Sequence, residues 1–204
     1  MKAAGVPVAE AKLVTRREAA ASDALPRPYV VKPVDEGSSV GVVIVRPGGN
    51  GHAQAILDGG PEDQIVMAER FIAGRELTCA VIGSFVTDVI EIVPRGGLAF
   101  YDFEAKYAPG GSEHELPAKI LPDVNQLIRK YTLAAHDSLG CRGVSRADFR
   151  FDDTQGGTGE LICLEVNTQP GMTGTSLVPE LAQYAGWRFG DLVRWIIEDA
   201  SCSR

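Results

Sequence analysis

The chain has 204 residues, 45% of them hydrophobic, which is enough to bury a core in one large domain or two small ones. Its formal net charge of −7 argues against a general nucleic-acid binder, because neutralising phosphates requires a basic surface. No apolar run approaches the roughly 20 residues of a membrane span, and Met1 to Thr15 lacks the apolar stretch of a signal peptide. We therefore expect a cytoplasmic protein that neither enters a membrane nor binds nucleic acid.

The first half of the chain predicts mainly strands. Residues 1–28 are rich in alanine and indicate a helix followed by a loop. Apolar runs at residues 29–34 and 40–45 predict a hairpin, because residues 35–39 between them are of the types that turn tightly. Further strands are expected at residues 64–71, 76–83 and 86–93.

The second half mixes helices with strands. Helical spacing of apolar residues over 122–139, ended by Gly140, predicts the clearest helix of the chain. Strands are expected at 144–151 and 160–166, and helices near 177–185 and 189–200. Four scattered cysteines show no metal-type spacing and are expected to be free thiols: Cys79, Cys141, Cys163 and Cys202. The pattern favours an α+β fold with mostly antiparallel sheets.

Alternation along two strands predicts a cluster of oxygen ligands. In residues 145–151, Arg146 and Asp148 share one face. In residues 161–167, the same period places Glu165 and Asn167 on one face and the apolar residues Ile162, Leu164 and Val166 in the core. If the two strands pair, the two carboxylates and the amide converge, and Mg²⁺ prefers such ligands. The alternative is a solvated sheet face with surface ion pairs.

Two further segments are typical of phosphate or anion binding. The loop that starts at Asn167 is rich in Gly, Thr and Ser, so its amides and the Ser176 hydroxyl could bind an anion, or Ser176 could simply cap a helix. Lys32 lies on an apolar strand before a Gly-Ser turn, which suits polyphosphate, although a lysine on an edge strand is equally compatible. Glu69 and Glu76 flank one strand crossover that could hold a purine and a ribose.

Five segments in order carry a family resemblance: VKPVDEGSSVGV, ERFIAGREL, FYDFEAKY, SRADFR and LEVNTQPGMTGTSLVP. Together they resemble the D-alanine–D-alanine ligases, which are ATP-grasp enzymes, over nearly the whole chain. The resemblance implies an ATP-grasp fold of two α+β subdomains with mostly antiparallel sheets that grip ATP between them. It further implies a truncated central subdomain at residues 1–74 and a C-terminal catalytic subdomain at residues 75–204.

The resemblance also assigns residue roles. Lys32 and Lys106 would contact phosphate, and Glu69 and Glu76 would contact adenine and ribose. Two Mg²⁺ (or Mn²⁺) ions would be held by Asp148, Glu165 and Asn167. The residues implied around the D-alanine substrates are Ser38, Tyr107, Arg146 and the amide of Gly171 for catalysis, and Ser176 and Leu177 for the second carboxylate. A tyrosine at position 107 goes with D-alanine as the second substrate in this family.

The implied reaction forms D-alanyl-D-alanine for peptidoglycan precursor synthesis. ATP phosphorylates the carboxylate of the first D-alanine, and the amine of the second D-alanine then attacks the acyl phosphate. Full-length relatives also carry an amino-terminal domain that contacts the first D-alanine, and they are expected to form homodimers. Two alternatives are a module that binds Mg-ATP without turnover and an ATP-grasp ligase for another carboxylate–amine pair.

Overall fold

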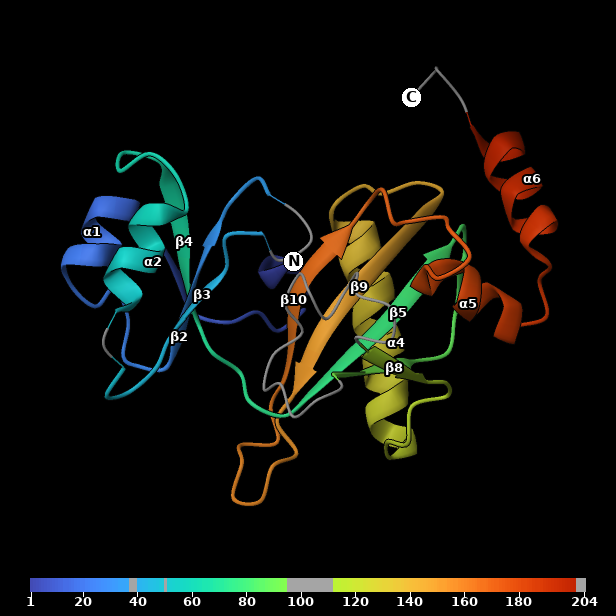
Figure 1. The fold of residues 1–204 in the computed structure, drawn as a ribbon. Helices are drawn as coiled ribbons and strands as arrows, with labels where there is room; N and C mark the ends of the chain where they lie inside the picture. The colour runs from blue at the N-terminus through green and yellow to red at the C-terminus, as the bar shows by residue number, and fades with distance from the viewer. Residues whose placement is uncertain (37–39, 50, 95–111, 201–204) are drawn as a thin grey trace. The chain divides into compact units, whose positions relative to one another are not determined.

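A computed structural model describes residues 1–36, 40–49, 51–94 and 112–200 of the chain (Figure 1). The chain forms two compact units, each with its own sheet. The small unit comprises Ala9–Ile72 and Pro94–Glu113, and the large unit comprises Met1–Val8, Ala73–Val93 and His114–Arg204. Among the described residues, no helix is both long and apolar enough to cross a membrane.

The small unit is a four-stranded antiparallel sheet with two short helices, and its strand order is β1-β4-β2-β3. Its elements are β1 (Ala11–Thr15), α1 (Arg16–Ala21), β2 (Tyr29–Pro33), β3 (Val43–Val45), α2 (His52–Asp58) and β4 (Ile65–Arg70). The predicted hairpin is confirmed, since β2 pairs with β3. Ala19 of α1 and Ile56 of α2 are buried against alternate strand residues, which include Tyr29, Val31 and Ala68.

Two elements of the small unit differ from the sequence prediction. Residues 1–28 contain the strand β1 as well as a helix, and α2 was not predicted at all. The start of α1 is fixed by a capping box, in which the Thr15 hydroxyl accepts the Glu18 amide and the Glu18 carboxylate accepts the Thr15 amide. This Thr-x-x-Glu pattern is a sequence signal for a helix start.

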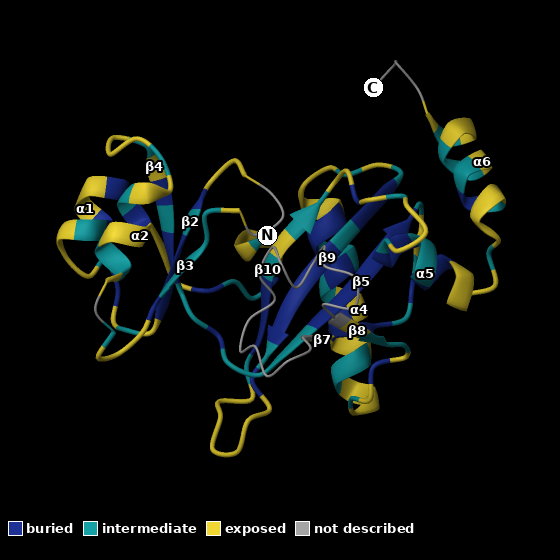
Figure 2. Cartoon of the chain, in the orientation of Figure 1, coloured by how far each residue is buried: buried dark blue, intermediate teal, exposed yellow. Residues whose placement is uncertain are grey.

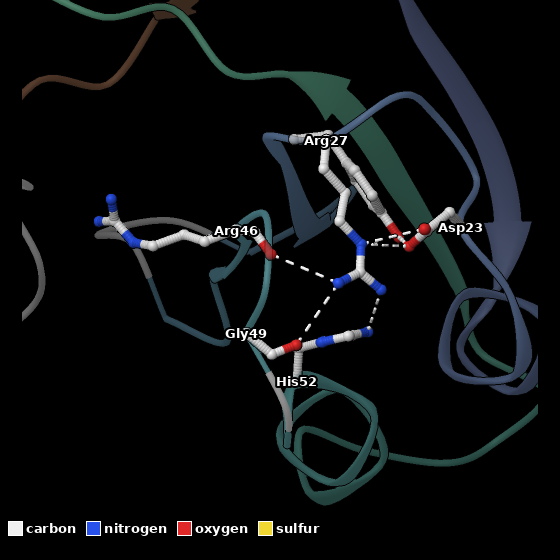
Figure 3. A network of polar contacts seen from close by, with 6 residues as sticks. Asp23, Arg27, Arg46, Gly49 and His52 are labelled. Carbon is white, nitrogen blue, oxygen red and sulfur yellow. Dashed lines mark hydrogen bonds and ion pairs between the residues drawn. The ribbon is translucent and has the colours of Figure 1, made fainter.

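An arginine organises the loops beside β2 and α2 (Figure 3). Arg27 Nε donates to both oxygens of Asp23, at 2.8 and 3.0 Å. Its Nη1 donates to the carbonyls of Arg46 and Gly49, and its Nη2 lies 3.2 Å from Nε2 of His52. The hydrogen bond from Arg27 lowers the pKa of Asp23. One guanidinium thus joins the loop before β2 to the turn that leads into α2.

The large unit holds the second sheet, with strand order β10-β9-β5-β7-β8 and β6 paired to β5. Its strands are β5 (Arg75–Ile82), β6 (Phe85–Val86), β7 (Ile90–Pro94), β8 (Ser112–Glu115), β9 (Val144–Phe151) and β10 (Leu161–Asn167). Its helices are the 3₁₀ turn η1 (Lys2–Ala4), α4 (Pro122–Ser138), α5 (Leu177–Tyr184) and α6 (Phe189–Asp199). These confirm the three helices predicted in the second half of the chain, and β8 is an addition to the prediction.

The core of the large unit lies between α4 and one face of the sheet. Ile128 and Ala135 of α4 pack with Leu77 of β5, Phe149 of β9 and Leu161 of β10. Strands β5 and β9 are buried over most of their length (Figure 2). Because strand side chains alternate, the residues between these core positions lie on the opposite face.

The strand predicted over residues 86–93 is divided into β6 and β7. The division occurs at Thr87, whose amide donates to the carbonyl of Ala80 while its hydroxyl accepts the Ala80 amide at 3.0 Å. A side-chain oxygen therefore takes the place of a backbone carbonyl, and the ladder is interrupted. The thiols of Cys79, Cys141 and Cys163 are free as predicted, and Cys202 lies outside the described residues.

Gly74 joins β5 to the chain before it under a double constraint. Its φ is +89°, and a Cβ at this position would lie 2.0 Å from the carbonyl oxygen of Phe151. Gly74→Ala is therefore expected to cost about 3 kcal/mol or more of unfolding free energy, measured by urea denaturation. The control is Gly186→Ala, where φ is +92° but nothing lies within 4 Å, with an expected cost of about 1 kcal/mol. Equal losses would show that the contact with Phe151 is not what requires glycine.

Asp152 organises the loop between β9 and β10. Its carboxylate accepts hydrogen bonds from the hydroxyls and amides of Thr154 and Thr158, at 2.5 to 3.4 Å. These bonds, led by that from the Thr154 hydroxyl, lower the pKa of Asp152 to about 2. Gly157 allows the close approach, since a Cβ there would lie 2.3 Å from the Asp152 carboxylate.

The depressed pKa has a predictable effect on stability. A carboxylate with a lowered folded-state pKa stabilises the fold above its unfolded-state value, near 3.8, and loses this contribution as the pH falls through about 2. The difference in unfolding free energy between the natural chain and Asp152→Asn should be constant from pH 7 to about pH 4 and then shrink. Urea denaturation of both chains at several pH values measures it. A difference that grows toward low pH would contradict this account.

Candidate functional site

The polar face of the large unit collects charged side chains from three neighbouring strands. Residues opposite each other in antiparallel strands lie on the same face. The register places Thr78 of β5 opposite Asp148 of β9, and Asp148 opposite Glu165 of β10. The neighbouring pair on the same face of β9 and β10 is Arg146 and Asn167. The strand pairing on which the sequence prediction depended is therefore present, and the acids lie side by side.

Asp148 is held by two partners. Arg146 approaches it in a bidentate contact, with Nε 2.9 Å from Oδ1 and Nη2 2.8 Å from Oδ2. The Thr78 hydroxyl donates to Oδ1 at 2.7 Å. Asp148 is only 6% exposed, so a charge here requires such charge-assisted hydrogen bonds.

Glu165 and Asn167 of β10 lie on the predicted face because of a β-bulge and not because of simple alternation. Simple alternation placed Ile162, Leu164 and Val166 together in the core. Ile162 is buried as predicted, but it lies opposite Arg150 and therefore not on the same face as Val166. The register shifts between Cys163 and Glu165, a β-bulge that leaves Leu164 without an opposite residue. After the bulge, Val166 packs against the α4 core while Glu165 and Asn167 face the side of Asp148 and Arg146.

Glu76 occupies the same polar face, at the end near the start of β5. It lies opposite Arg150, and Arg150 Nη1 is 3.5 Å from Glu76 Oε2. Both side chains are mostly buried, with 11% of Glu76 and 9% of Arg150 exposed. The contact is an ion pair at the long end of hydrogen-bond range, between two mostly buried charges.

The loop that follows β10 is folded tightly on itself. Asn167 Oδ1 accepts the amide of Gln169 at 3.0 Å, and Ser176 Oγ accepts the amide of Thr173 at 3.0 Å. Ser176 takes the N-cap position of α5, but its hydroxyl makes no hydrogen bond to the helix amides, so the alternative of a side-chain cap is not what the structure shows. A Cβ on Gly171 would lie 2.7 Å from Ser176 Oγ, which explains glycine at this position.

The side chain and the backbone of Leu177 have different environments. The side chain is buried at 9% exposure and packs in the interior. The backbone amide belongs to the first turn of α5, where amides have no partner within a helix. If Leu177 binds a ligand, it can do so through this amide and not through its side chain.

In the small unit, Lys32 and Glu69 form an ion pair, with Nζ 2.9 Å from Oε1. Their neighbours Val31 and Ala68 belong to the core under α1 and α2, so alternation places Lys32 and Glu69 on the face away from these helices. Only 20% of the Lys32 side chain and 11% of the Glu69 side chain are exposed. Two of the predicted nucleotide contacts, Lys32 and Glu69, therefore share one face of this sheet.

Several predicted residues are not tested by the structure. Ser38, Lys106 and Tyr107 lie outside the described residues. Within the described residues, no group of three or more His, Cys, Asp and Glu side chains is placed to hold a metal ion. The predicted ligand set contains two acids, and its third member, Asn167, contributes an amide oxygen. The metal site thus stays a prediction that rests on Asp148, Glu165 and Asn167.

Comparison with known proteins decides the family. The family model for the D-ala D-ala ligase C-terminus matches residues 1–198. The chain belongs to this family. The curated D-alanine–D-alanine ligase of Methylobacterium radiotolerans is 59% identical over 206 residues, covering all of this chain and 66% of that protein. The chain therefore spans just under two thirds of that relative's length.

Solved ligase structures have the same fold. The VanG D-Ala:D-Ser ligase of Enterococcus faecalis has a TM-score of 0.77 and 30% identity, covering 97% of this chain and 58% of that one. A D-alanine–D-alanine ligase of Bacillus anthracis complexed with ATP has a TM-score of 0.72 and 27% identity, covering 97% and 62%. The predicted ATP-grasp fold, an α+β fold of mostly antiparallel sheets, is confirmed.

Thr78 is a site residue that the sequence prediction did not include. Alternation from Glu76 would have placed it on the polar face, but a threonine in an apolar strand gives no further signal of function. The structure shows why the residue matters, because its hydroxyl is fully buried and donates to a buried carboxylate.

Thr78→Val keeps the shape of the side chain and removes the hydroxyl. A hydrogen bond to a charged group is worth about 1.5 to 3 kcal/mol, so this loss of unfolding free energy is expected in urea denaturation. The control is Thr132→Val in α4, whose buried hydroxyl donates to the neutral carbonyl of Ile128 at 2.8 Å, with an expected loss of about 1 kcal/mol. Equal losses at the two positions would argue against a charge-assisted bond at Asp148.

Proposed function

We propose that this chain is the ATP-binding and catalytic part of an ADP-forming D-alanine–D-alanine ligase that serves peptidoglycan precursor synthesis. The observation that carries the proposal is the row of Thr78, Asp148 and Glu165 beside Arg146 and Asn167, in a chain of this ligase family. The Bacillus anthracis ligase was solved in complex with ATP, and we extend this nucleotide to the present chain. Because ATP and precursor synthesis are intracellular, we place the activity in the cytoplasm.

Asp148, Glu165 and Asn167 would hold the two Mg²⁺ or Mn²⁺ ions. The fit is supported by the donor set, because two carboxylates and an amide oxygen on adjacent strands are hard oxygen ligands. When bound, such ions neutralise charge on the transferring phosphoryl group. Asp148 needs support for this role, and Arg146 and Thr78 fix its orientation.

Arg146 would stabilise negative charge that develops on the carboxyl of the first D-alanine. A guanidinium that is 15% exposed acts in a medium of lower polarity than water, where its field is stronger. The amide of Gly171, and Ser38 on the loop after β2, would act on the same group. The protein's contribution to the reaction is thus positioning and charge stabilisation.

Four residues are proposed as nucleotide contacts. Lys32 and Lys106 would bind phosphate oxygens as point charges, and Glu69 and Glu76 would accept hydrogen bonds from adenine or ribose. The ion pair of Lys32 with Glu69 supports this role, because it fixes the ammonium group on the face of the sheet away from α1 and α2. Ser176 and the Leu177 amide would bind the carboxylate of the second D-alanine, and Tyr107 would favour D-alanine there.

The experiment that tests this function is phosphate release from Mg-ATP on addition of D-alanine. It should be run on the 204-residue chain and on the same chain joined behind the amino-terminal third of the Methylobacterium radiotolerans ligase. Release that depends on D-alanine in either form supports the proposal. ATP binding in calorimetry without release in either form would indicate a nucleotide-binding module. Release only with other amino acids would indicate a ligase for another substrate pair.

Glu165→Gln supplies the residue-level test. Removing one charge from the proposed metal ligands should weaken phosphate release by about 100-fold and change the free energy of unfolding by less than about 1 kcal/mol. The control is Glu198→Gln, because Glu198 is an exposed acid on α6 and should leave both quantities unchanged. A large loss of stability with unchanged Mg-ATP affinity would assign Glu165 a structural role instead.

A further inference from the structure

His114 and Glu180 form a contact that none of the roles above uses. His114 Nδ1 lies 2.6 Å from Glu180 Oε2, although the two residues are 66 positions apart in sequence. The two atoms are within hydrogen-bond distance, and the contact is an ion pair when the imidazole ring is protonated. The side chains are 20% and 37% exposed, so the contact is less screened than a fully exposed ion pair.

One partner of this contact, Glu180, lies in the first turn of α5. Glu180 is the acidic residue of that turn, and its amide donates to the carbonyl of Ser176 at 3.3 Å. The free amides of a helix start carry partial positive charge and attract anions. Glu180 therefore lies about one helical turn from the amide of Leu177, the group that the proposed function gives to a substrate carboxylate.

The negative charge of Glu180 would repel a second carboxylate near the start of α5. Glu180 is the only charged residue of α5, and an uncompensated negative charge there would repel an incoming carboxylate. The other acids of β8 are Glu113 and Glu115, and Glu115 is paired with Lys119. Among the described residues, His114 is the basic side chain in contact with Glu180.

We propose that His114, as an imidazolium, neutralises Glu180 and so keeps the first turn of α5 receptive to the carboxylate of the second amino acid. This inference rests on the proposed function, because it takes that carboxylate to be the ligand of the turn. His114 is then a positioning residue that acts through Glu180. The pair sets the charge at the turn and touches neither the phosphates nor the reacting carboxyl group.

Two substitutions separate charge from structure. His114→Asn retains a donor for Glu180 near the position of Nδ1 but removes the positive charge, and Glu180→Gln removes the negative charge with little change of shape. Both can be combined in one chain. If only charge matters, the double variant should recover what the His114→Asn variant loses, whereas a purely structural contact would leave the double variant no better than the single.

The measurement is binding of D-alanine to the 204-residue chain, followed by the shifts of the Ser176 and Leu177 amides in ¹⁵N NMR spectra. The apparent Kd should rise by about three- to fivefold in His114→Asn, because one unit charge near a helix start has about this effect. It should be unchanged or lower in Glu180→Gln, and within about twofold of the natural chain in the double variant. The Kd for Mg-ATP should be the same in all four chains.

Several results would overturn the inference. They are an unchanged Kd in His114→Asn, no recovery in the double variant, or no shift of these amides on addition of D-alanine to the natural chain. Phosphate release tests the proposed function separately. Phosphate release without amide shifts would contradict the inference but support the ligase function. The expected Kd pattern without phosphate release would support a carboxylate site but contradict the ligase function.

Discussion

The bidentate contact between Arg146 and Asp148 is the constraint around which the large unit is arranged. A carboxylate that is 6% exposed is stable in its charged form only if fixed donors replace the water it has lost. Arg146 comes from the same strand, two residues earlier, and Thr78 comes from the next strand. Arg146 reaches Asp148 within β9, whereas Thr78 reaches it only in the observed register of β5 with β9.

That register depends in turn on the opposite face of the same strands. Leu77, Phe149 and Leu161 pack under α4, and a slip of one residue would exchange the apolar and polar faces. Burial of the core and assembly of the charged row are thus two results of one alignment. In the small unit the same principle holds, because Val31 and Ala68 face the helices and thereby direct Lys32 and Glu69 to the other side.

The sequence was sufficient where a pattern was long and regular. The helix α4 and the strand β9 have enough residues for their period to be clear. The convergence of Asp148 with Glu165 was predicted from the period of both strands, although in β10 it is the bulge that brings Glu165 to this face. Short elements were missed for the opposite reason. Strand β1 has five residues, and Leu13 on it is 67% exposed, so its apolar pattern carries little information about burial.

Contacts between distant residues could not be predicted from the sequence. The partner of Thr78 is 70 positions away, and that of His114 is 66 positions away, so no local spacing relates them. The hydroxyl of Ser176 also illustrates the limit of local patterns. It sits where a helix cap is expected, yet it serves the preceding loop, because Thr173 offers both an amide and a hydroxyl at close range.

The bulge in β10 has a consequence for how this strand can change during evolution. Leu161 and Cys163 before the bulge, and Val166 after it, all pack on the α4 side, although they do not follow one alternation. Leu164 has no opposite residue, so the alternation is interrupted there. Odd-numbered residues face α4 before it, and the even-numbered Val166 faces α4 after it. Deleting that one residue would remove the bulge and leave Glu165 and Asn167 on the polar face, whereas pairing Leu164 into the ladder would turn both toward the α4 core. The polar row therefore tolerates the loss of the bulged residue but not its incorporation into the ladder.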